Sequence, residues 1–253
     1  MSRTVPFAPL FTGHDAGAYT LPADLLAARD TFVKVSAVPF PAPPRNAWET
    51  IHAVARATVD AVHNGTPLPD PARIEAARQA ERVYQDVVDM MDLCREDAAD
   101  RVRTAVDPDE VITCHLAPAH DETWETFKAA WRILTDYGHT QPRHLLVAPA
   151  KVRKAADTVE AASARYVLVR AARSVLHVQC PDDPGGKYAG IRNFHTLHPI
   201  RLRHGRTPWH GLDTRAFLGW MAEHGGDLWM PTAAQQAEAV EAEAHIGQPN
   251  RPT

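Results

Sequence analysis

A seven-residue hydrophobic repeat marks the longest uninterrupted segment of the chain. Residues 71–106 contain no glycine, and no proline after the first position, and Asp70-Pro71 provides a cap and a first helical position. Apolar residues recur there every seven positions, at Ala77, Tyr84, Met91, Ala98 and Ala105. The places between them are filled by Ala80, Val87, Val88, Cys94 and Val102. Because residues seven apart lie on one helix face, the pattern predicts a single helix of roughly 54 Å whose stripe packs against another helix.

A second helix is predicted ahead of this one, in residues 46–64. Asn46 can cap its first turn together with Glu49, and Asn64-Gly65 provides a left-handed end. Its inner stripe is predicted to hold Trp48, Ile51, Val54, Ala55, Thr58 and Val62. Thr20-Leu21-Pro22 is typical of the start of an earlier helix, and the chain before it is expected to be loose. The four prolines of residues 39–44 predict an extended linker.

Two further helices are predicted after the long one. Asp107-Pro108 repeats the cap-and-proline start, and Tyr137-Gly138 provides the end. The segment VITCHL within this region has strand-forming residues, but a helix that Pro118 kinks is the simpler interpretation. Pro149 opens the next helix, whose apolar positions continue at helical spacing to Leu176.

The pattern changes at Cys180, where prolines and glycines interrupt the chain. IRNFHTL is compatible with a short strand, and Asp213 and Thr232 each begin a short helix. The predicted fold is mainly α: a long-helix bundle or helical hairpin with a small, loop-rich C-terminal module that is α with minor β. The predicted parts are an arm with a short helix and the Pro-rich linker (1–45), a long-helix body (46–179) and the C-terminal module (180–253).

Composition narrows the class of protein. The 253 residues carry a formal net charge of -4, and no apolar stretch reaches the roughly 18 to 20 residues that a membrane span needs. The start of the chain lacks the pattern of a secretion signal. Cys94, Cys114 and Cys180 lie far apart, so we expect reduced and mostly buried thiols, with neither a disulfide framework nor a cysteine-rich zinc site.

No catalytic motif occurs in the sequence. It has no G-x-S-x-G elbow, no phosphate-binding glycine loop and no H-E-x-x-H pair, so we expect no enzymatic cofactor. A metal-dependent hydrolase or nuclease is kept as an alternative because histidines are frequent. Its candidate residues are dispersed: His115, His120, Asp121, His195 and His198. Pro199 and the three-residue spacing of His195 and His198 disfavour a shared metal in either a helix or a strand.

Charge and aromatic residues suggest two other kinds of surface. Residues 213–245 carry one Arg against six carboxylates, which argues against a DNA-binding pair of helices there. A weaker nucleic-acid hypothesis rests on the basic residues Lys151, Arg153, Lys154, Arg165, Arg170 and Arg173. The candidates for a protein interface are Tyr84, Met91, Trp209, Trp220 and Trp229, although packing in the core is the default for the tryptophans.

Four segments carry a resemblance to known proteins: PAPPRNAWETIHAVARATVDAV, ITCHLAPAHDETWE, ARYVLVRAARSVL and FLGWMAEHGGDLWMPTAAQQAEAV. Their order resembles a group of helical proteins of unknown function from the virion-gene modules of actinobacterial phages and prophages. The resemblance implies a phage-associated setting, and with the missing secretion signal and membrane span it leads us to expect a cytoplasmic or virion-associated protein. Together with the long stripe, it leads us to expect a non-enzymatic assembly protein whose partners are other copies of itself or other virion proteins. Nucleic acid and membranes are not expected as partners.

Overall fold

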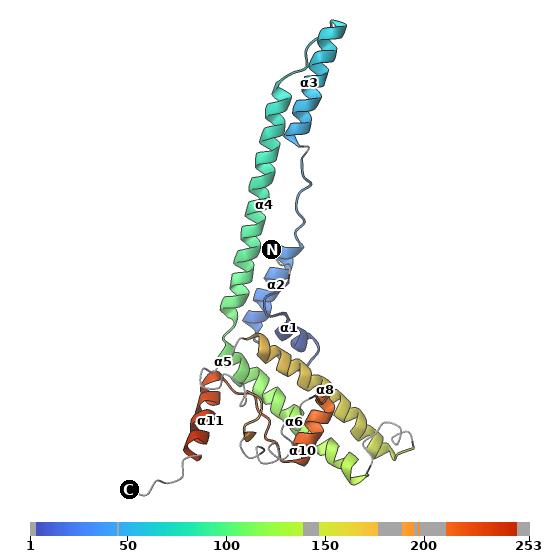
Figure 1. The fold of residues 1–253 in the computed structure, drawn as a ribbon, viewed down its shortest axis with the longest axis vertical. Coiled ribbons are helices and arrows are strands. Elements are labelled where there is room, and N and C mark those ends of the chain that lie inside the picture. The colour runs from blue at the N-terminus through green and yellow to red at the C-terminus, as the bar shows by residue number, and fades with distance from the viewer. Residues whose placement is uncertain are drawn as a thin grey trace, which may run out of the picture. The chain divides into compact units, whose positions relative to one another are not determined.

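The computed structural model describes residues 4–44, 46–138, 147–176, 189–194, 197 and 211–246. These residues are mainly helical, as the sequence predicted (Figure 1). They divide into two compact units. Unit 1 comprises Met1–Pro6 and Asp24–Ala105, and unit 2 comprises Phe7–Ala23 and Val106–Thr253. The division differs from the predicted one, in which residues 46–179 formed a single body.

Unit 1 is built on one long helix. Helix α3 (Ala47–Asn64) packs on α4 (Ala72–Ala105), and α2 (Ala23–Ala37) is joined to α3 by the extended proline-rich segment (Figure 1). Asn46 Oδ1 accepts a 2.8 Å hydrogen bond from the Trp48 N–H, which begins α3, and Gly65 ends it with a positive φ of 64°. Asp70 caps α4 through the Ala72 N–H at 2.9 Å, so the predicted starts of both helices are confirmed.

The inner stripe of α4 alternates steps of three and four residues along the whole helix. Its members are all buried or half-buried: Ile74, Ala77, Glu81, Tyr84, Val88, Met91, Arg95, Ala98, Val102 and Ala105. Two of them are charged, and each binds a residue of the segment before α4. Glu81 Oε1 accepts a 2.7 Å hydrogen bond from the Ala47 N–H, whereas Arg95 donates to the Val38 carbonyl at 3.1 Å and lies 4.1 Å from the centre of the Phe40 ring.

The inner face of α3 agrees with the predicted one only in its middle. Val54 of the predicted stripe is buried, and Ile51 and Thr58 are half-buried. Trp48, Ala55 and Val62 are exposed, and the buried residues at the two ends are Ala47 and Ala61 instead. Small alanines at these positions let two helices approach closely.

Unit 2 has a core formed by two long helices. Helices α6 (Ala117–Asp136) and α8 (Ala150–Val175) pack side by side, and α10 (Thr214–Glu223) covers them (Figure 1). The core is centred on residues such as Phe127, Leu134, Val159, Leu218 and Met221. Helix α11 (Ala233–Ile246) begins at Thr232, where the Gln235 N–H donates to Oγ1 and Gln235 Oε1 accepts from the Thr232 N–H. The predicted helix starts at Asp213 and Thr232 are therefore confirmed.

The start of α6 contains a π-helical turn. After the short helix α5 (Pro108–Glu110), residues Val111–Leu116 form η1, and the Ala117 N–H bonds to the Ile112 carbonyl five residues back. Pro118 follows directly. Because proline has no N–H and crowds the carbonyl four residues before it, a wider turn ahead of it relieves the clash. VITCHL is thus helical, as predicted, and the irregularity at Pro118 is a π turn.

Residues 4–19 are ordered, and for this described part of the N-terminus the prediction of a loose chain was wrong. Helix α1 (Ala8–Asp15) packs on α8 with Leu10 and Phe11 buried. The Tyr19 hydroxyl donates to the Leu10 carbonyl at 2.7 Å, and Arg165 Nε donates to the Ala18 carbonyl at 2.9 Å. This segment is held by its contact with α8, a helix more than a hundred residues away. The sequence of the segment itself does not reveal that contact.

Two smaller predictions have mixed outcomes. Within the part of IRNFHTL that the structure describes, Ile191 forms a single antiparallel bridge with Leu228, so pairing occurs without an extended strand. The expectation of buried thiols was wrong for Cys94 and Cys114, which are both exposed, and Cys180 lies outside the described residues. None of the described helices is both long and apolar enough to cross a membrane.

Candidate functional site

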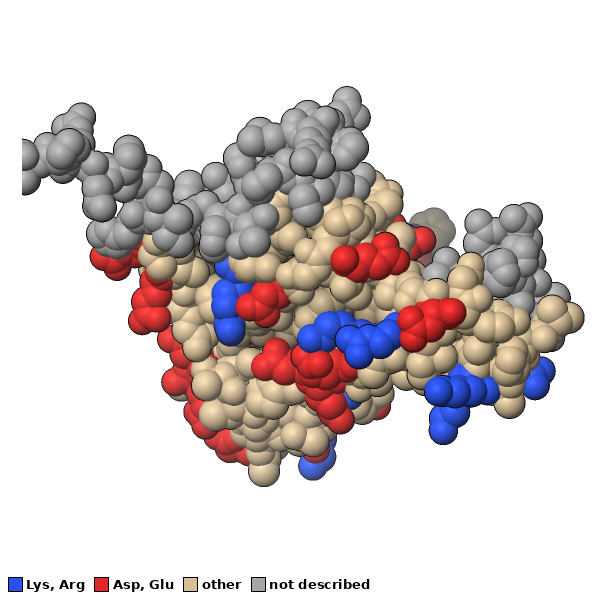
Figure 2. Space-filling model, turned by 90° about the horizontal axis from the view of Figure 1, so that it is seen from below, with Lys and Arg blue, Asp and Glu red and all other residues tan. Residues whose placement is uncertain are grey.

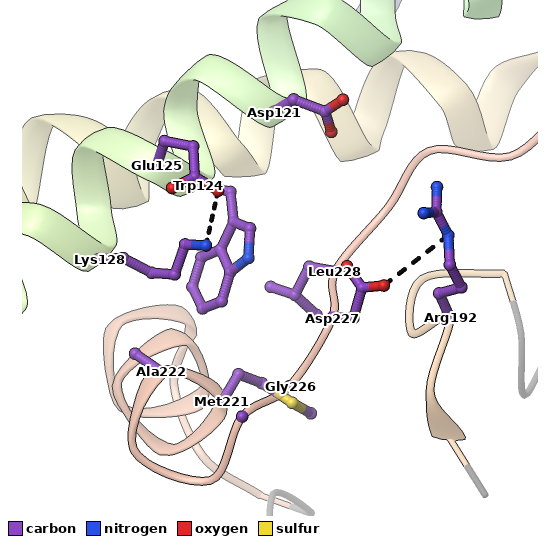
Figure 3. Close-up of a pocket in the computed structure, with 11 residues that line it drawn as sticks. Asp121, Trp124, Glu125, Lys128, Arg192, Met221, Ala222, Gly226, Asp227 and Leu228 are labelled. Carbon is purple, nitrogen blue, oxygen red and sulfur yellow. Dashed lines mark ion pairs between the residues drawn. The ribbon is translucent and has the colours of Figure 1, made fainter. Parts of the chain in front are cut away.

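A pocket of about 430 Å³ opens in unit 2 beside α6 (Figure 3). Helix α6 forms one wall, and the end of α10 with the segments around Arg192 and Asp227 forms the others. The lining residues are Asp121, Trp124, Glu125, Lys128, Arg192, Met221, Ala222, Gly225, Gly226, Asp227 and Leu228. Apolar side chains thus lie next to three carboxylates and two cations.

The charges of the pocket are paired. Lys128 Nζ lies 2.6 Å from Glu125 Oε1 and 5.4 Å from the centre of the Trp124 ring. Arg192 Nε lies 3.8 Å from Asp227 Oδ2 on the opposite side (Figure 3). The Arg192 guanidinium also lies 4.7 Å from the centre of the Trp229 ring. Because each cation has a carboxylate next to it, the two cations do not form a site for an anion.

A small hydrogen-bond network fixes the wall of the pocket opposite α6. Asn193 Nδ2 donates to the Gly225 carbonyl at 2.8 Å, and Asn193 Oδ1 accepts from the Asp227 N–H at the same distance. The Arg192 N–H donates to the Asp227 carbonyl at 2.7 Å. One asparagine therefore joins two segments more than thirty residues apart, and the Ile191–Leu228 bridge continues the contact.

His120 is the predicted residue with the most unusual surroundings. Its side chain is fully buried on α6, with Nδ1 3.1 Å from Asp121 Oδ1 and its ring centre 5.6 Å from that of Tyr166. Its Nε2 has no hydrogen-bond partner. Burial lowers the pKa of His120 below its ordinary value, more than the hydrogen bond to Asp121 raises it. The ring is therefore neutral near pH 7, and it is not among the described residues that line the pocket.

The dispersed metal site is not assembled in the part of the chain that the structure describes. No group of three or more His, Cys, Asp or Glu side chains is placed there to hold a metal ion. His120 and Asp121 are adjacent, whereas His115 lies on η1. His195 and His198 lie outside the described residues. The described wall of the pocket also has no Ser, Thr, Cys or His, so a hydroxyl or thiol nucleophile has no source in it.

The six basic residues of the nucleic-acid hypothesis do not share one surface. Arg173 is buried and donates to the Pro231 carbonyl, Arg170 donates to the Ala189 carbonyl, and Arg165 bonds Ala18 and Glu122. Lys151, Arg153 and Lys154 are exposed near the start of α8. On the face drawn in Figure 2, the coloured residues place red and blue groups side by side. Three of the six arginines and lysines thus have structural partners within unit 2.

The predicted interface residues are mostly covered. Trp229 is buried in the core of unit 2, and Trp220 is half-buried with its ring stacked on His224 at 4.1 Å between centres. Met91 is buried and Tyr84 half-buried on the inner stripe of α4. Trp209 lies outside the described residues. These side chains support the fold of their own unit, so they are not the exposed surface that an interface needs.

The exposed apolar side chains lie elsewhere, and most of them belong to unit 1. Among the described residues, nine large exposed hydrophobics are in unit 1 and four in unit 2. Those of unit 1 are Val33, Val38, Trp48, Val59, Val62, Leu68, Val83, Met90 and Leu93. The helices of unit 1 contain more apolar residues than one inner stripe per helix can bury. This excess is the sequence signal for exposed hydrophobics, and the sequence analysis missed it.

Comparison with known proteins adds no relative. No protein-family model matches the chain, and no curated protein and no solved structure is significantly similar to it. The two units and their surfaces are therefore the basis for any statement about function.

Proposed function

We propose that this protein is a non-enzymatic assembly protein, which acts through protein–protein contacts of its helical unit 1. The observation that carries the proposal is the concentration of exposed large hydrophobics in that unit. Trp48, Val62 and Leu93 are 63%, 72% and 71% exposed. Exposed apolar side chains that gather on one part of a soluble protein are typical of a surface that a partner covers.

The shape of α4 supports the same function. A helix of 34 residues extends roughly 51 Å, and such a helix offers a long, narrow contact surface rather than a pocket. The phage or prophage setting comes from the resemblance of the four segments given above. Within that setting, we propose a structural component of the particle, or a protein that takes part in head or tail assembly.

The test uses the purified full-length chain and the purified products of the genes adjacent to its own. Light scattering after size-exclusion chromatography would measure the mass of the chain alone and of each mixture. We expect a mass above that of the monomer in at least one case. Met90→Glu on α4 should weaken that association, and Val167→Glu on α8 of unit 2 is the matched control, because the two side chains are similarly exposed, at 55% and 47%. A strict monomer in every mixture would contradict the proposal.

A further inference from the structure

Helix α4 carries a second stripe, distinct from the inner one. Starting at Arg73, it again alternates steps of three and four residues. Its members are Arg73, Ala76, Ala80, Val83, Val87, Met90, Cys94 and Asp97. Six consecutive positions are apolar or a thiol, and a charged residue ends the stripe on each side. Each member precedes a member of the inner stripe by one residue, so at 100° per residue the second stripe is centred about 100° from the inner one around the helix.

The second stripe is open to solvent. Val83 and Met90 are 49% and 55% exposed, Ala76, Ala80 and Cys94 are exposed, and Val87 is half-buried. Leu93, at 71% exposure, borders the stripe and widens its apolar surface. The inner stripe at the same height is buried or half-buried. The alternating spacing of a two-helix contact therefore occurs twice on α4, and within unit 1 only one of the two is covered.

The second stripe is symmetric about Gln85. Val83 and Val87 lie equally far from Gln85 along the helix, and the same is true of Ala80 and Met90, of Ala76 and Cys94, and of Arg73 and Asp97. A two-fold axis perpendicular to α4 at Gln85 would bring the members of each pair face to face between two chains. Small residues would then lie opposite larger ones, and the basic end opposite the acidic end.

We propose that a second copy of this chain packs antiparallel on the second stripe of α4, forming a two-fold symmetric dimer. This inference rests on the proposed function and names one partner for it. A parallel pair would place Met90 against Met90 and would bring two copies of Arg73, and two of Asp97, together. The antiparallel pair avoids the Met90 contact and the like-charge contacts. It places Arg73 opposite the partner's Asp97 at each end of roughly 36 Å of helix.

Native Cys94 allows a direct test of the geometry. In full-length protein with Cys114→Ser and Cys180→Ser, Cys94 is the single thiol. In the antiparallel dimer the two Cys94 residues are roughly 27 Å apart, so mild oxidation should not join them. Adding Ala76→Cys places a thiol opposite the partner's Cys94. We expect covalent dimer to form roughly tenfold faster or more than in the protein with Cys94 alone.

Arg78→Cys is the matched control for this measurement. It lies two residues from Ala76 but on the far side of α4 from the second stripe, and it is also exposed. Equal crosslinking rates for Ala76→Cys and Arg78→Cys would indicate random collision and overturn the proposal. Rapid joining of Cys94 alone would show a parallel pair and would overturn it as well.

A second measurement separates this inference from the proposed function. In sedimentation of the full-length protein over a range of concentrations, Val83→Glu should shift the dimer to monomer, because it places a carboxylate beside the axis. Val59→Glu on α3, which is also exposed, should leave the dimer intact. Arg73→Asp should weaken the dimer, and Arg73→Asp combined with Asp97→Arg should restore it.

The outcomes distinguish the two proposals. A wild-type chain that is monomeric at every concentration, yet binds the product of an adjacent gene, would refute the dimer and leave the assembly function standing. A chain that binds neither itself nor any adjacent product would refute both.

Discussion

The carboxylate of Glu81, in the first third of the inner stripe of α4, accepts a 2.7 Å hydrogen bond from the backbone N–H of Ala47, the first residue of α3. A charge in an apolar stripe normally weakens helix packing. Here it binds one of the N–H groups that the first turn of α3 leaves without a partner within the helix. The pair therefore fixes the position at which α3 begins along α4.

We expect Glu81→Ala to loosen α3. Loss of this charge-assisted bond should cost about 1 kcal/mol, and amide hydrogens of α3 should exchange roughly fivefold faster. Glu81→Gln keeps an acceptor and should have a smaller effect. Glu75→Ala is the control, because Glu75 and its partner Arg82 are both about two-thirds exposed and 3.8 Å apart. Equal effects of Glu81→Ala and Glu75→Ala would contradict this role.

Acid should weaken unit 2 through His120. Burial lowers the pKa of His120 in the folded chain below the ordinary value of 6.5, so the unfolded chain takes up a proton first as the pH falls. The stability linked to His120 is therefore complete above about pH 7 and is lost as the pH falls through 6.5 toward the lower folded pKa. Urea unfolding at pH 7.5, 6.5 and 5.5 measures this change. His120→Gln should flatten it, and an unchanged slope in that variant would assign the acid sensitivity to other groups.

Arg173 is expected to stabilise the contact between α8 and the start of α11. Its guanidinium donates to the Pro231 carbonyl at 3.1 Å and to Gln236 Oε1 at 3.2 Å. Burial, and then the nearby charge of Arg170, lowers the pKa of Arg173 to about 10. Arg173→Met would remove the donor of both hydrogen bonds and should lower the free energy of unfolding by about 2 to 3 kcal/mol. Arg153→Met, at an exposed position of the same helix, should change it by less than about 0.5 kcal/mol.

Gly219 allows α10 to approach α6. A Cβ atom at this position would clash with Cζ2 of the Trp131 ring, whose Nε1 donates to Glu223 Oε1 at 3.1 Å. Gly219→Ala should therefore destabilise unit 2 by about 1 to 3 kcal/mol, although alanine favours helices more than glycine does. Urea unfolding of Gly219→Ala, Trp131→Phe and the double variant measures the coupling. Simple additivity of the two losses would show that the ring and the new methyl group do not clash.

The helices could be read from the sequence because their signals are local. The caps at Asn46, Asp70, Asp107, Asp213 and Thr232 lie where they were predicted, since a capping side chain bonds an amide two or three residues away. The long stripe of α4 likewise depends only on the period of one helix. A mainly α fold follows from these signals alone.

The candidate sites depended on contacts that local patterns do not encode. Tryptophan and arginine are residue types that are common at binding sites, yet packing against distant segments buries both Trp229 and Arg173. The pocket beside α6 joins residues about a hundred positions apart, such as Trp124 and Asp227. Its walls could not be predicted, because no periodicity links them.

The sequence by itself determined that this chain is mainly helical, where most helices begin, and that α4 is long. Only the tertiary structure decided which of the apolar residues of α4 are covered. The sequence pattern does not separate the inner stripe from the second stripe, because alanine, valine and methionine are equally apolar on either face of a helix. Packing of α3 and the proline-rich segment on one stripe leaves Val83 and Met90 exposed on the other, and the burial of Met91 beside them shows the difference. A neighbouring residue on the same helix can therefore have the opposite role.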